Sequence, residues 1–361
     1  MTDSGLTISV APLVAKHPPM PGGRCMPYLL GVAVLLAIVG SLLLGAYPMP
    51  FDQAVTIVAH LAWPGPLPDD PSWNIKELTV IQTVRLPRVL VATLAGMGLG
   101  MAGAALQGVM RNPLVGPDLV GVTSGAAFGG VLAMLFGWPP IGVVGLAFVG
   151  GLLAMGLTFT LARLARNGGN GMALILAGVF IGAFFIALVG LVQFVAPDVK
   201  LPGMVYWLLG SFIGVDAQKV FMIAIPTLGG GAVLMLLRWR INLLSLGDLD
   251  AASLGVDVRW LRWLVIAVVS LIVAAQVSVA GVIGWVGLVV PHLARMLVGP
   301  DHRRLLPASA LLGGLFVLGL DDVTRTIVRG ELPVGVLSAL VGTPFICFLF
   351  WKTQTKGWSD Q

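Results

Sequence analysis

Residues 85–114 read RLPRVLVATLAGMGLGMAGAALQGVMRNPL. Between Arg88 and Arg111 this stretch contains no Asp, Glu, Lys or Arg. A helix that crosses the ~30 Å of bilayer hydrocarbon needs about 20 such residues. Pro87 suits the first turn of a helix, where its missing N–H costs nothing, and Pro113 suits the residues just beyond a helix end. The stretch therefore predicts a membrane-spanning helix over 89–110.

The composition of the whole chain is that of an integral membrane protein. Of its 361 residues, 57% are hydrophobic and 10% are charged, and the mean hydropathy is +0.97. An ordinary soluble protein carries about 25% charged residues. This contrast excludes a soluble enzyme, a nucleic-acid binder and a disordered tail. The alternating pattern of a membrane β-barrel is not visible either. We therefore predict an all-α polytopic protein whose surroundings are lipid, with no nucleic-acid partner.

Uncharged runs along the chain predict about ten spans, although hydropathy is compatible with eight to ten. A turn at 137–140 and a glycine-rich break at 281–287 each divide one long run into two helices. The short run 305–320 is expected to be tilted or only partly embedded. The predicted spans are 28–47, 89–110, 119–136, 141–162, 172–195, 218–237, 261–282, 284–298, 305–320 and 333–351.

The distribution of basic residues predicts the orientation. Fourteen Lys and Arg lie on the inner side if both termini are cytoplasmic, against seven on the outer side. We expect a cytoplasmic tail over 1–27, a transmembrane domain over 28–351 that includes a cytoplasmic loop at 238–260, and a second tail over 352–361. The first apolar stretch is expected to be a retained span rather than a cleaved signal peptide. The proline-rich outer loop 48–84 is expected to form an ordered cap.

The chain lacks the residues that would supply its own energy. None of its six lysines follows a glycine, so the Gly-Lys-Ser/Thr of a phosphate-binding loop is absent. Apart from Lys219, Arg262 and Arg295 near span ends, the predicted spans contain no Asp, Glu, Lys or Arg, and His292 is their one histidine. Ion-coupled carriers normally keep ionisable groups at mid-membrane. The pore is therefore passive, or another subunit provides the energy.

Metal binding is not expected. The four histidines are scattered, and Cys25 and Cys347 lie near opposite ends of the chain. His292 is the one candidate for a haem or metal ligand, but a histidine beside a proline near a helix end is more often a packing residue.

Several motifs appear in the order in which one transporter family has them. Together they cover residues ~85 to 350 and resemble the permease of type II ABC importers for iron chelates, haem and vitamin B12, the FecCD-type family. The motifs are Arg85-Leu86-Pro87-Arg88, Gln107-Gly108-Val109-Met110-Arg111-Asn112-Pro113-Leu114, Gly121-Val122-Thr123-Ser124-Gly125-Ala126, Tyr206-Trp207-Leu208-Leu209-Gly210-Ser211-Phe212, Gly284-Trp285-Val286-Gly287-Leu288-Val289-Val290-Pro291-His292, Asp301-His302-Arg303 and Glu331-Leu332-Pro333-Val334-Gly335.

The resemblance implies a non-enzymatic, ten-helix subunit of the bacterial inner membrane. Such a subunit pairs with a second copy, expected here as a homodimer, and the translocation path lies between them. Two cytoplasmic subunits bind ATP and Mg and drive alternating access, and a periplasmic binding protein delivers the cargo. A ferric siderophore or haem is the first expectation for that cargo, cobalamin the second and molybdate the third. The rival hypotheses are a secondary carrier or channel of unrelated fold, and a membrane enzyme.

The resemblance also assigns three arginines to docking of the binding protein: Arg85, Arg88 and Arg325. Charge complementarity with acidic residues would set register and association rate. The alternative for Arg85 and Arg88 is interfacial anchoring. Arg329 competes with Arg325, and internal pairing of these arginines with Asp321, Asp322 and Glu331 would weaken the docking hypothesis.

Two cytoplasmic features are candidates for coupling and gating. Residues 247–260 predict a short helix that ends at a glycine and resembles the helix that couples the family to its ATPase; its site residues are Asp248, Asp250, Ala251, Ala252, Leu254 and Gly255. An ordinary connection is the alternative. By resemblance the cytoplasmic gate contains Asn112 and Leu114, with Gly171 and Met172 from the next hairpin.

Three phenylalanines at helical spacing, Phe180, Phe184 and Phe185, lie in the span 172–195. Phe180 and Phe184 are candidates for lining the path, although core packing is the more common role of such residues.

Overall fold

The protein is all-helical in a computed structural model that describes residues 25–45, 47, 49–62, 73–164, 171–327 and 332–357. Within these residues, seven helices are long and apolar enough to cross a membrane, and three shorter apolar helices accompany them. The sum matches the ten predicted spans. The long helices are α1 (Met26–Leu43), the continuous α3 (Ile75–Thr79), η1 (Val80–Arg85) and α4 (Leu86–Met110), α6 (Pro140–Leu164), α7 (Gly171–Val195), α9 (Ala217–Leu246), α11 (Val258–Ala280) and α13 (His302–Ile327).

The remaining helices are shorter, or, in the case of α14, have an apolar segment that is shorter than the helix. Three of them complete the set of spans: α5 (Val122–Leu135), α12 (Val286–Val298) and the apolar part of α14 (Val334–Gly357). The others connect or cap the spans: α2 (Phe51–Ala62), η2 (Pro117–Val120), α8 (Leu201–Leu208) and α10 (Asp248–Ser253).

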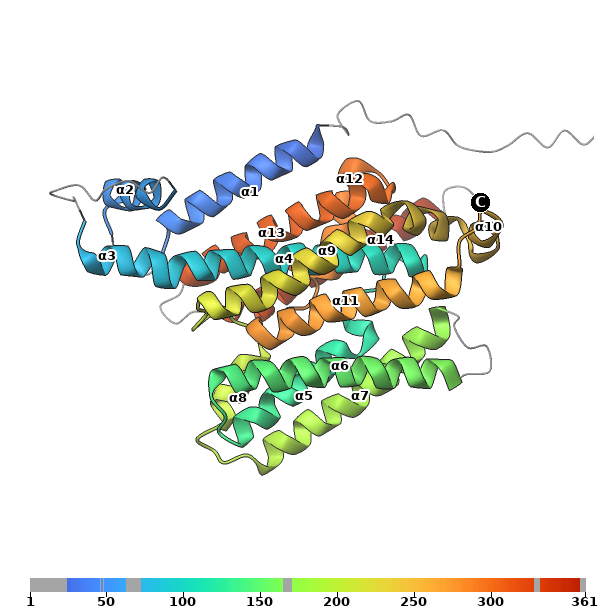
Figure 1. Cartoon of the computed structure of the whole chain (residues 1–361), viewed down its shortest axis with the longest axis horizontal. Helices are drawn as coiled ribbons and strands as arrows, with labels where there is room; N and C mark the ends of the chain where they lie inside the picture. The colour runs from blue at the N-terminus through green and yellow to red at the C-terminus, as the bar shows by residue number, and fades with distance from the viewer. Residues whose placement is uncertain are drawn as a thin grey trace, which may run out of the picture.

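Helix α4 is the centre of the bundle. It packs against α9, α11, α12 and α13, whereas α5, α6, α7 and α8 form a second group beside α11 (Figure 1). The glycines of the opening motif make this possible. A Cβ built on Gly96 would lie 2.0 Å from the carbonyl oxygen of Gly313, and one on Gly103 would lie 1.8 Å from that of Gly287. Small residues let membrane helices approach this closely.

The second span begins earlier than the sequence predicts. Asn74 caps α3 in a capping box with Glu77, and the helix continues through the π-helical η1 into α4. Pro87 therefore lies inside a continuous helix instead of starting it. The widened register of η1, in which Leu86 donates to Ile81, immediately precedes this proline. The expected cap 48–84 is ordered where it is described, in α2 and α3, while residues 63–72 lie outside the described part.

Two other helices continue through charged residues. Helix α13 extends to Ile327, beyond the predicted 305–320, because Asp321 and Arg325 are buried against neighbouring helices. Helix α9 extends to Leu246 through Arg238, so the first part of the expected cytoplasmic loop is helical. A charged residue therefore does not by itself mark the end of a helix in this chain.

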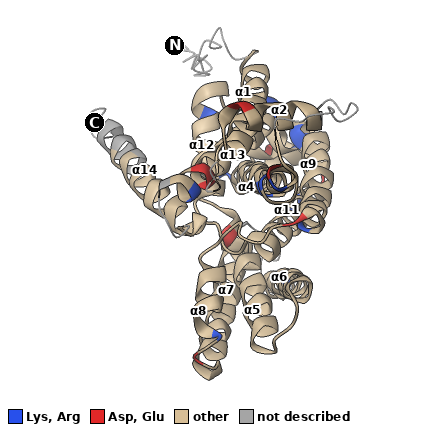
Figure 2. Ribbon diagram, turned by 90° about the vertical axis from the view of Figure 1, so that its left-hand side faces the viewer, with Lys and Arg blue, Asp and Glu red and all other residues tan. Residues whose placement is uncertain are grey.

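The predicted glycine-rich break separates α11 from α12. Gly281 ends α11 with φ of 70°, and Trp285 precedes α12 with φ of 69°, a conformation uncommon outside glycine. The Ser211 N–H donates to the carbonyl of Ala280 at 2.8 Å, which ties the connection after α8 to this break. Viewed along the bundle, the helices are uncharged over most of their length, and α14 leans away from the rest (Figure 2).

Candidate functional site

The end of the bundle that the basic residues predict to be outer carries a buried ion pair. Arg88 of α4 donates to the carboxylate of Asp321 of α13 from Nε at 3.0 Å and from Nη2 at 2.8 Å. Both side chains are buried. A bidentate pair of this kind fixes the relative position of two helices as well as neutralising both charges.

Two further arginines hold the end of α1 against this pair. Arg85 donates to the carbonyls of Leu42 at 3.0 Å and Tyr47 at 2.8 Å. Arg325 donates to the carbonyl of Ser41 at 2.9 Å and forms an ion pair with Asp322. The expected alternative of internal pairing is thus what the described residues show for Asp321 and Asp322. Arg329 and Glu331 lie outside the described residues, and docking by the arginines stays a prediction.

At the opposite end, the short helix predicted within 247–260 is present as α10, and its coupling role stays a prediction. It begins at Asp248 after Gly247, whose φ is 142°, and it ends before Gly255, whose φ is 82°. The helix is thus six residues long, shorter than the expected 247–260, since α11 already starts at Val258. Ala251 is fully buried, while Leu249 is 87% exposed. The short helix therefore presents an exposed apolar side chain at this end of the bundle.

Asp248 ties this helix to its neighbours. Its carboxylate accepts from Nη2 of Arg262 in α11 at 2.8 Å and lies 3.5 Å from Nη2 of Arg111 at the end of α4. The side chain of Leu254 is also exposed. The backbone carbonyl of Asp250 accepts the backbone N–H of Leu254. Asp248 thereby links α10 to α11 and to the end of α4.

That connection carries two of the predicted gate residues. Arg111 ends α4 in the left-handed conformation, with φ of 51°, and Asn112 Oδ1 accepts the N–H of Leu114 at 2.9 Å. Leu114 and Met172 are both exposed. Gly171 is the first residue of α7, and the loop 165–170 before it lies outside the described residues. The grouping of these residues into one gate stays a prediction.

The contact between this connection and α7 runs through a residue that sequence reasoning missed. A Cβ on Gly178 would lie 2.1 Å from the carbonyl oxygen of Leu119, so only glycine lets η2 lie directly on α7. Gly121 then turns the chain into α5 with φ of 80°. The motif that opens at Gly121 could have signalled this turn.

The phenylalanines of α7 divide between two environments. Phe185 is buried and its ring lies 5.7 Å from that of Phe128. Phe180 and Phe184 are 56% and 55% exposed. Core packing, the more common role, therefore applies to Phe185 alone, and path lining by the other two stays a prediction.

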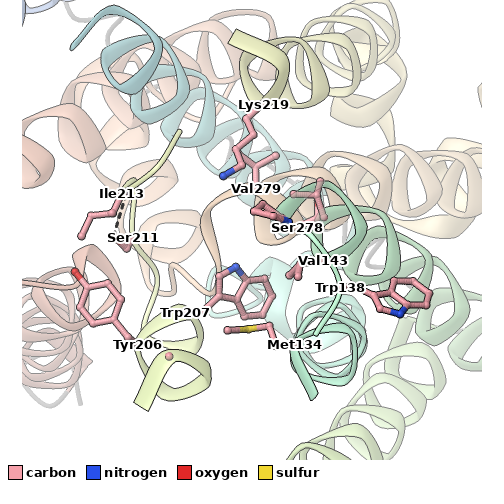
Figure 3. Close-up of a pocket in the computed structure, with 13 residues that line it drawn as sticks. Met134, Trp138, Val143, Tyr206, Trp207, Ser211, Ile213, Lys219, Ser278 and Val279 are labelled. Atoms are coloured by element: carbon pink, nitrogen blue, oxygen red, sulfur yellow. Dashed lines mark hydrogen bonds between the residues drawn. The ribbon is translucent and has the colours of Figure 1, made fainter. Parts of the chain in front are cut away.

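Two cavities open near the short helix α8. One, of about 420 Å³, lies between α5, α8 and the start of α9, where Lys219 reaches towards Ser278 and Val279 with Trp207 and Met134 on the other side (Figure 3). The Lys219 ammonium donates to the carbonyl of Gly214 at 2.7 Å. Aromatic and aliphatic groups make up most of the remaining wall.

The larger cavity, of about 680 Å³, lies between the break at 281–285, α8 and α14. Its lining is apolar apart from one threonine hydroxyl and the indole of Trp285. The lining residues are Leu208, Leu209, Val282, Gly284, Trp285, Gly335, Val336, Ala339, Leu340, Thr343 and Pro344.

This arrangement, a glycine-packed bundle with a broken helix at a cavity and a short helix at one end, matches a known family over most of its length. The model of the FecCD transport family matches residues 33–352. The chain belongs to the FecCD transport family. It is accordingly the membrane permease of an ABC importer, and the catalytic ATPase of such an importer is a separate subunit.

Three curated relatives of this FecCD permease are 38–41% identical to it over the aligned residues. The molybdate import permease MolB of Haemophilus influenzae is 40% identical and aligns with 92% of this chain and 97% of its own length. The hemin transport permease HmuU of Yersinia pestis is 38% identical, and the alignment covers 92% of this chain and 98% of HmuU. The cobalamin import permease BtuC of Halobacterium salinarum is 41% identical, and the alignment covers 77% of this chain and 74% of BtuC.

A solved structure agrees with the fold of this FecCD permease. An ABC transporter of metal-chelate type, described in an inward-facing conformation, superposes with a TM-score of 0.80 at 38% identity. The superposition covers 91% of this chain and 99% of that one. The multi-pass membrane architecture is therefore shared over the whole solved chain.

Proposed function

We propose that this permease forms a homodimer that moves a metal chelate from the periplasm to the cytoplasm by alternating access. Two cytoplasmic subunits that bind ATP and Mg drive it, and a periplasmic binding protein delivers the cargo. A ferric siderophore or haem is the first choice of cargo, cobalamin the second and molybdate the third. Relatives named for four kinds of cargo, including an iron chelatin permease of Helicobacter pylori at 42% identity, are almost equally similar, so identity does not choose among them.

The observation that carries the choice of a chelate is the lining of the 680 Å³ cavity. No Lys or Arg is among its described lining residues, and most of its wall is aliphatic or glycine. An oxyanion is bound by charged donors or converging N–H groups, whereas a bulky ligand with an apolar surface suits a wall of this kind.

Exposed apolar faces support the pairing with a second copy. On α14, Leu340 is 67% exposed and Phe348 is 53% exposed; on α7, Phe194 is 87% exposed. Part of this surface would face lipid in either case. The lean of α14 away from the bundle (Figure 2) leaves its apolar face open to a partner.

The structure of α10 supports the coupling role. Leu249 and Leu254 would insert into a cleft of the ATPase, and the Asp248–Arg111 ion pair would pass the motion of α10 to the gate connection. Coupling by this route needs no titratable group within the path.

Uptake into proteoliposomes tests the proposal. The permease would be reconstituted with its ATPase and binding protein, and uptake of haem, ferric siderophores, cobalamin and molybdate would be measured with and without internal ATP. ATP-dependent uptake of a chelate is the expected result. ATP-dependent uptake of molybdate alone would overturn the choice of cargo, and uptake that ignores ATP would overturn the importer mechanism.

A further inference from the structure

One carboxylate lies at a depth where the predicted spans contain no acid. Asp118 belongs to η2, in the connection between α4 and α5, which the sequence places at the membrane surface. In the structure this connection folds back between helices. The ring of Pro117 lies so close to Gly287 that a Cβ on that glycine would be 2.5 Å from Pro117 Cδ, and Leu119 lies on Gly178.

These contacts fix the depth of Asp118. Gly178 is the eighth residue of α7 and Gly287 is eleven residues from the end of α12. At 1.5 Å per residue, the two contacts lie roughly 10 and 16 Å from the cytoplasmic ends of their helices. Measured from these helix ends, Asp118 lies between a third and a half of the way across a hydrocarbon core about 30 Å thick.

Asp118 is exposed, although Pro117 before it and Val120 two residues after it are buried. Its Oδ1 accepts from the Thr123 hydroxyl at 2.9 Å. Among the described residues no cation pairs with it. An unpaired carboxylate at mid-membrane is costly unless it faces water or a ligand.

The other oxygen faces the large cavity. A Cβ built on Gly284 would lie 3.9 Å from Asp118 Oδ2, and Gly284 is itself part of the cavity wall beside Trp285. The acid thus stands at the edge of an otherwise uncharged space. A fixed negative charge in a low-dielectric setting attracts cations and hydrogen-bond donors and repels anions.

We infer that Asp118 lines the translocation path and selects cargo that presents positive charge or hydrogen-bond donors. This inference rests on the proposed function and narrows its cargo. It ranks a cationic ferric siderophore or an amide-bearing cobalamin above haem, whose propionates are anionic, and above molybdate.

The charge and its accessibility can be measured without knowing the cargo. The full-length permease, assembled with its ATPase, would first carry Cys25→Ser and Cys347→Ser, because both native thiols are exposed. Asp118→Cys should then react with a charged methanethiosulfonate reagent in at least one nucleotide state. Protection of this thiol in every state would overturn the inference.

The sign of the electrostatic potential beside Asp118 can be measured with a cysteine introduced at a neighbouring position. Gly284→Cys places a sulfur beside Asp118 where the backbone has room for a Cβ. The rate of modification by a cationic trimethylammonium reagent is divided by the rate for an anionic sulfonate reagent. We expect this ratio to be about tenfold higher in Gly284→Cys than in the double variant Gly284→Cys/Asp118→Asn. Taking the ratio on one thiol removes any change in thiolate fraction. Equal ratios would contradict a charged path.

Transport then tests selectivity. Asp118→Asn keeps an acceptor for Thr123 and should lower ATP-driven uptake of a cationic ferric hydroxamate about tenfold. The matched control is Asp198→Asn, the same loss of charge at an exposed position outside the spans. Unchanged or increased uptake in Asp118→Asn would overturn the inference. If the wild type shows no ATP-driven uptake at all, the proposed function fails, while the thiol ratio still reports on Asp118.

Discussion

At the scale of single residues, the charges inside this permease divide into paired and unpaired groups. Arg88 and Asp321 form an ion pair at the outer end of the bundle, while Asp118, at the edge of a cavity, has no cation partner among the described residues. The paired groups hold helices together. The unpaired one is costly for stability and is therefore a candidate for function.

The buried pair gives a prediction about stability. Arg88→Met leaves the carboxylate of Asp321 with only Arg325, whose Nε lies 3.6 Å from it. Removing one partner of a buried pair costs about 3–5 kcal/mol where the remaining charge has no other partner, so we expect a smaller loss here. We expect a clear fall in the thermal unfolding midpoint of the detergent-solubilised protein. The exposed Arg240→Met is the control and should leave the midpoint unchanged. Adding Asp321→Leu to Arg88→Met should recover part of the loss; no loss in the single variant would show that the pair contributes little.

At the scale of helices, close glycine contacts set the packing of α4. Gly96→Ala would place a methyl group 2.0 Å from the Gly313 carbonyl oxygen, so α13 would have to move. Overpacking of this kind costs about 1–3 kcal/mol. Gly229→Ala on α9, where the added Cβ meets nothing within 4 Å, is the matched control. Equal unfolding midpoints for the two variants would contradict the packing described for α4 and α13.

The coupling helix gives a prediction about activity. Leu249→Ala removes an exposed apolar side chain of α10 and should leave the fold intact. We expect ATP-driven uptake, and the stimulation of ATPase activity by the binding protein, to fall about tenfold. Ser253→Ala on the same helix, whose hydroxyl contacts only the Asp250 carbonyl in the described structure, should retain both. Full activity of Leu249→Ala would show that α10 is an ordinary connection.

The elements of this fold were predictable to the extent that they depend on local hydropathy. The ten spans, the break at Gly281 and the short helix after Gly247 all follow from uncharged runs and glycine positions. The extension of α13 past Asp321 did not, because a charged residue continues a buried helix only when a distant partner such as Arg88 is present. The depth of Asp118 also depends on a contact between residues far apart in the sequence. Close packing of Leu119 against Gly178 brings a polar connection into the membrane.

At the scale of the whole molecule, the permease contains cavities between its helices, but its sequence has no Gly-Lys-Ser/Thr motif of a phosphate-binding loop. The FecCD family match covers residues 33–352, and the described structure places the short helix α10 at one end and cavities along the bundle. A carrier driven by an ion gradient would work without an ATPase subunit. The two mechanisms therefore differ in what stops transport.

Uptake of a ferric hydroxamate into proteoliposomes containing this chain, its ATPase and its binding protein is the most direct test. We predict that uptake requires internal ATP, stops when the ATPase subunit is omitted, and persists when ionophores collapse proton and sodium gradients. Uptake that continues without the ATPase and is abolished by ionophores would contradict the account of an ATP-driven permease.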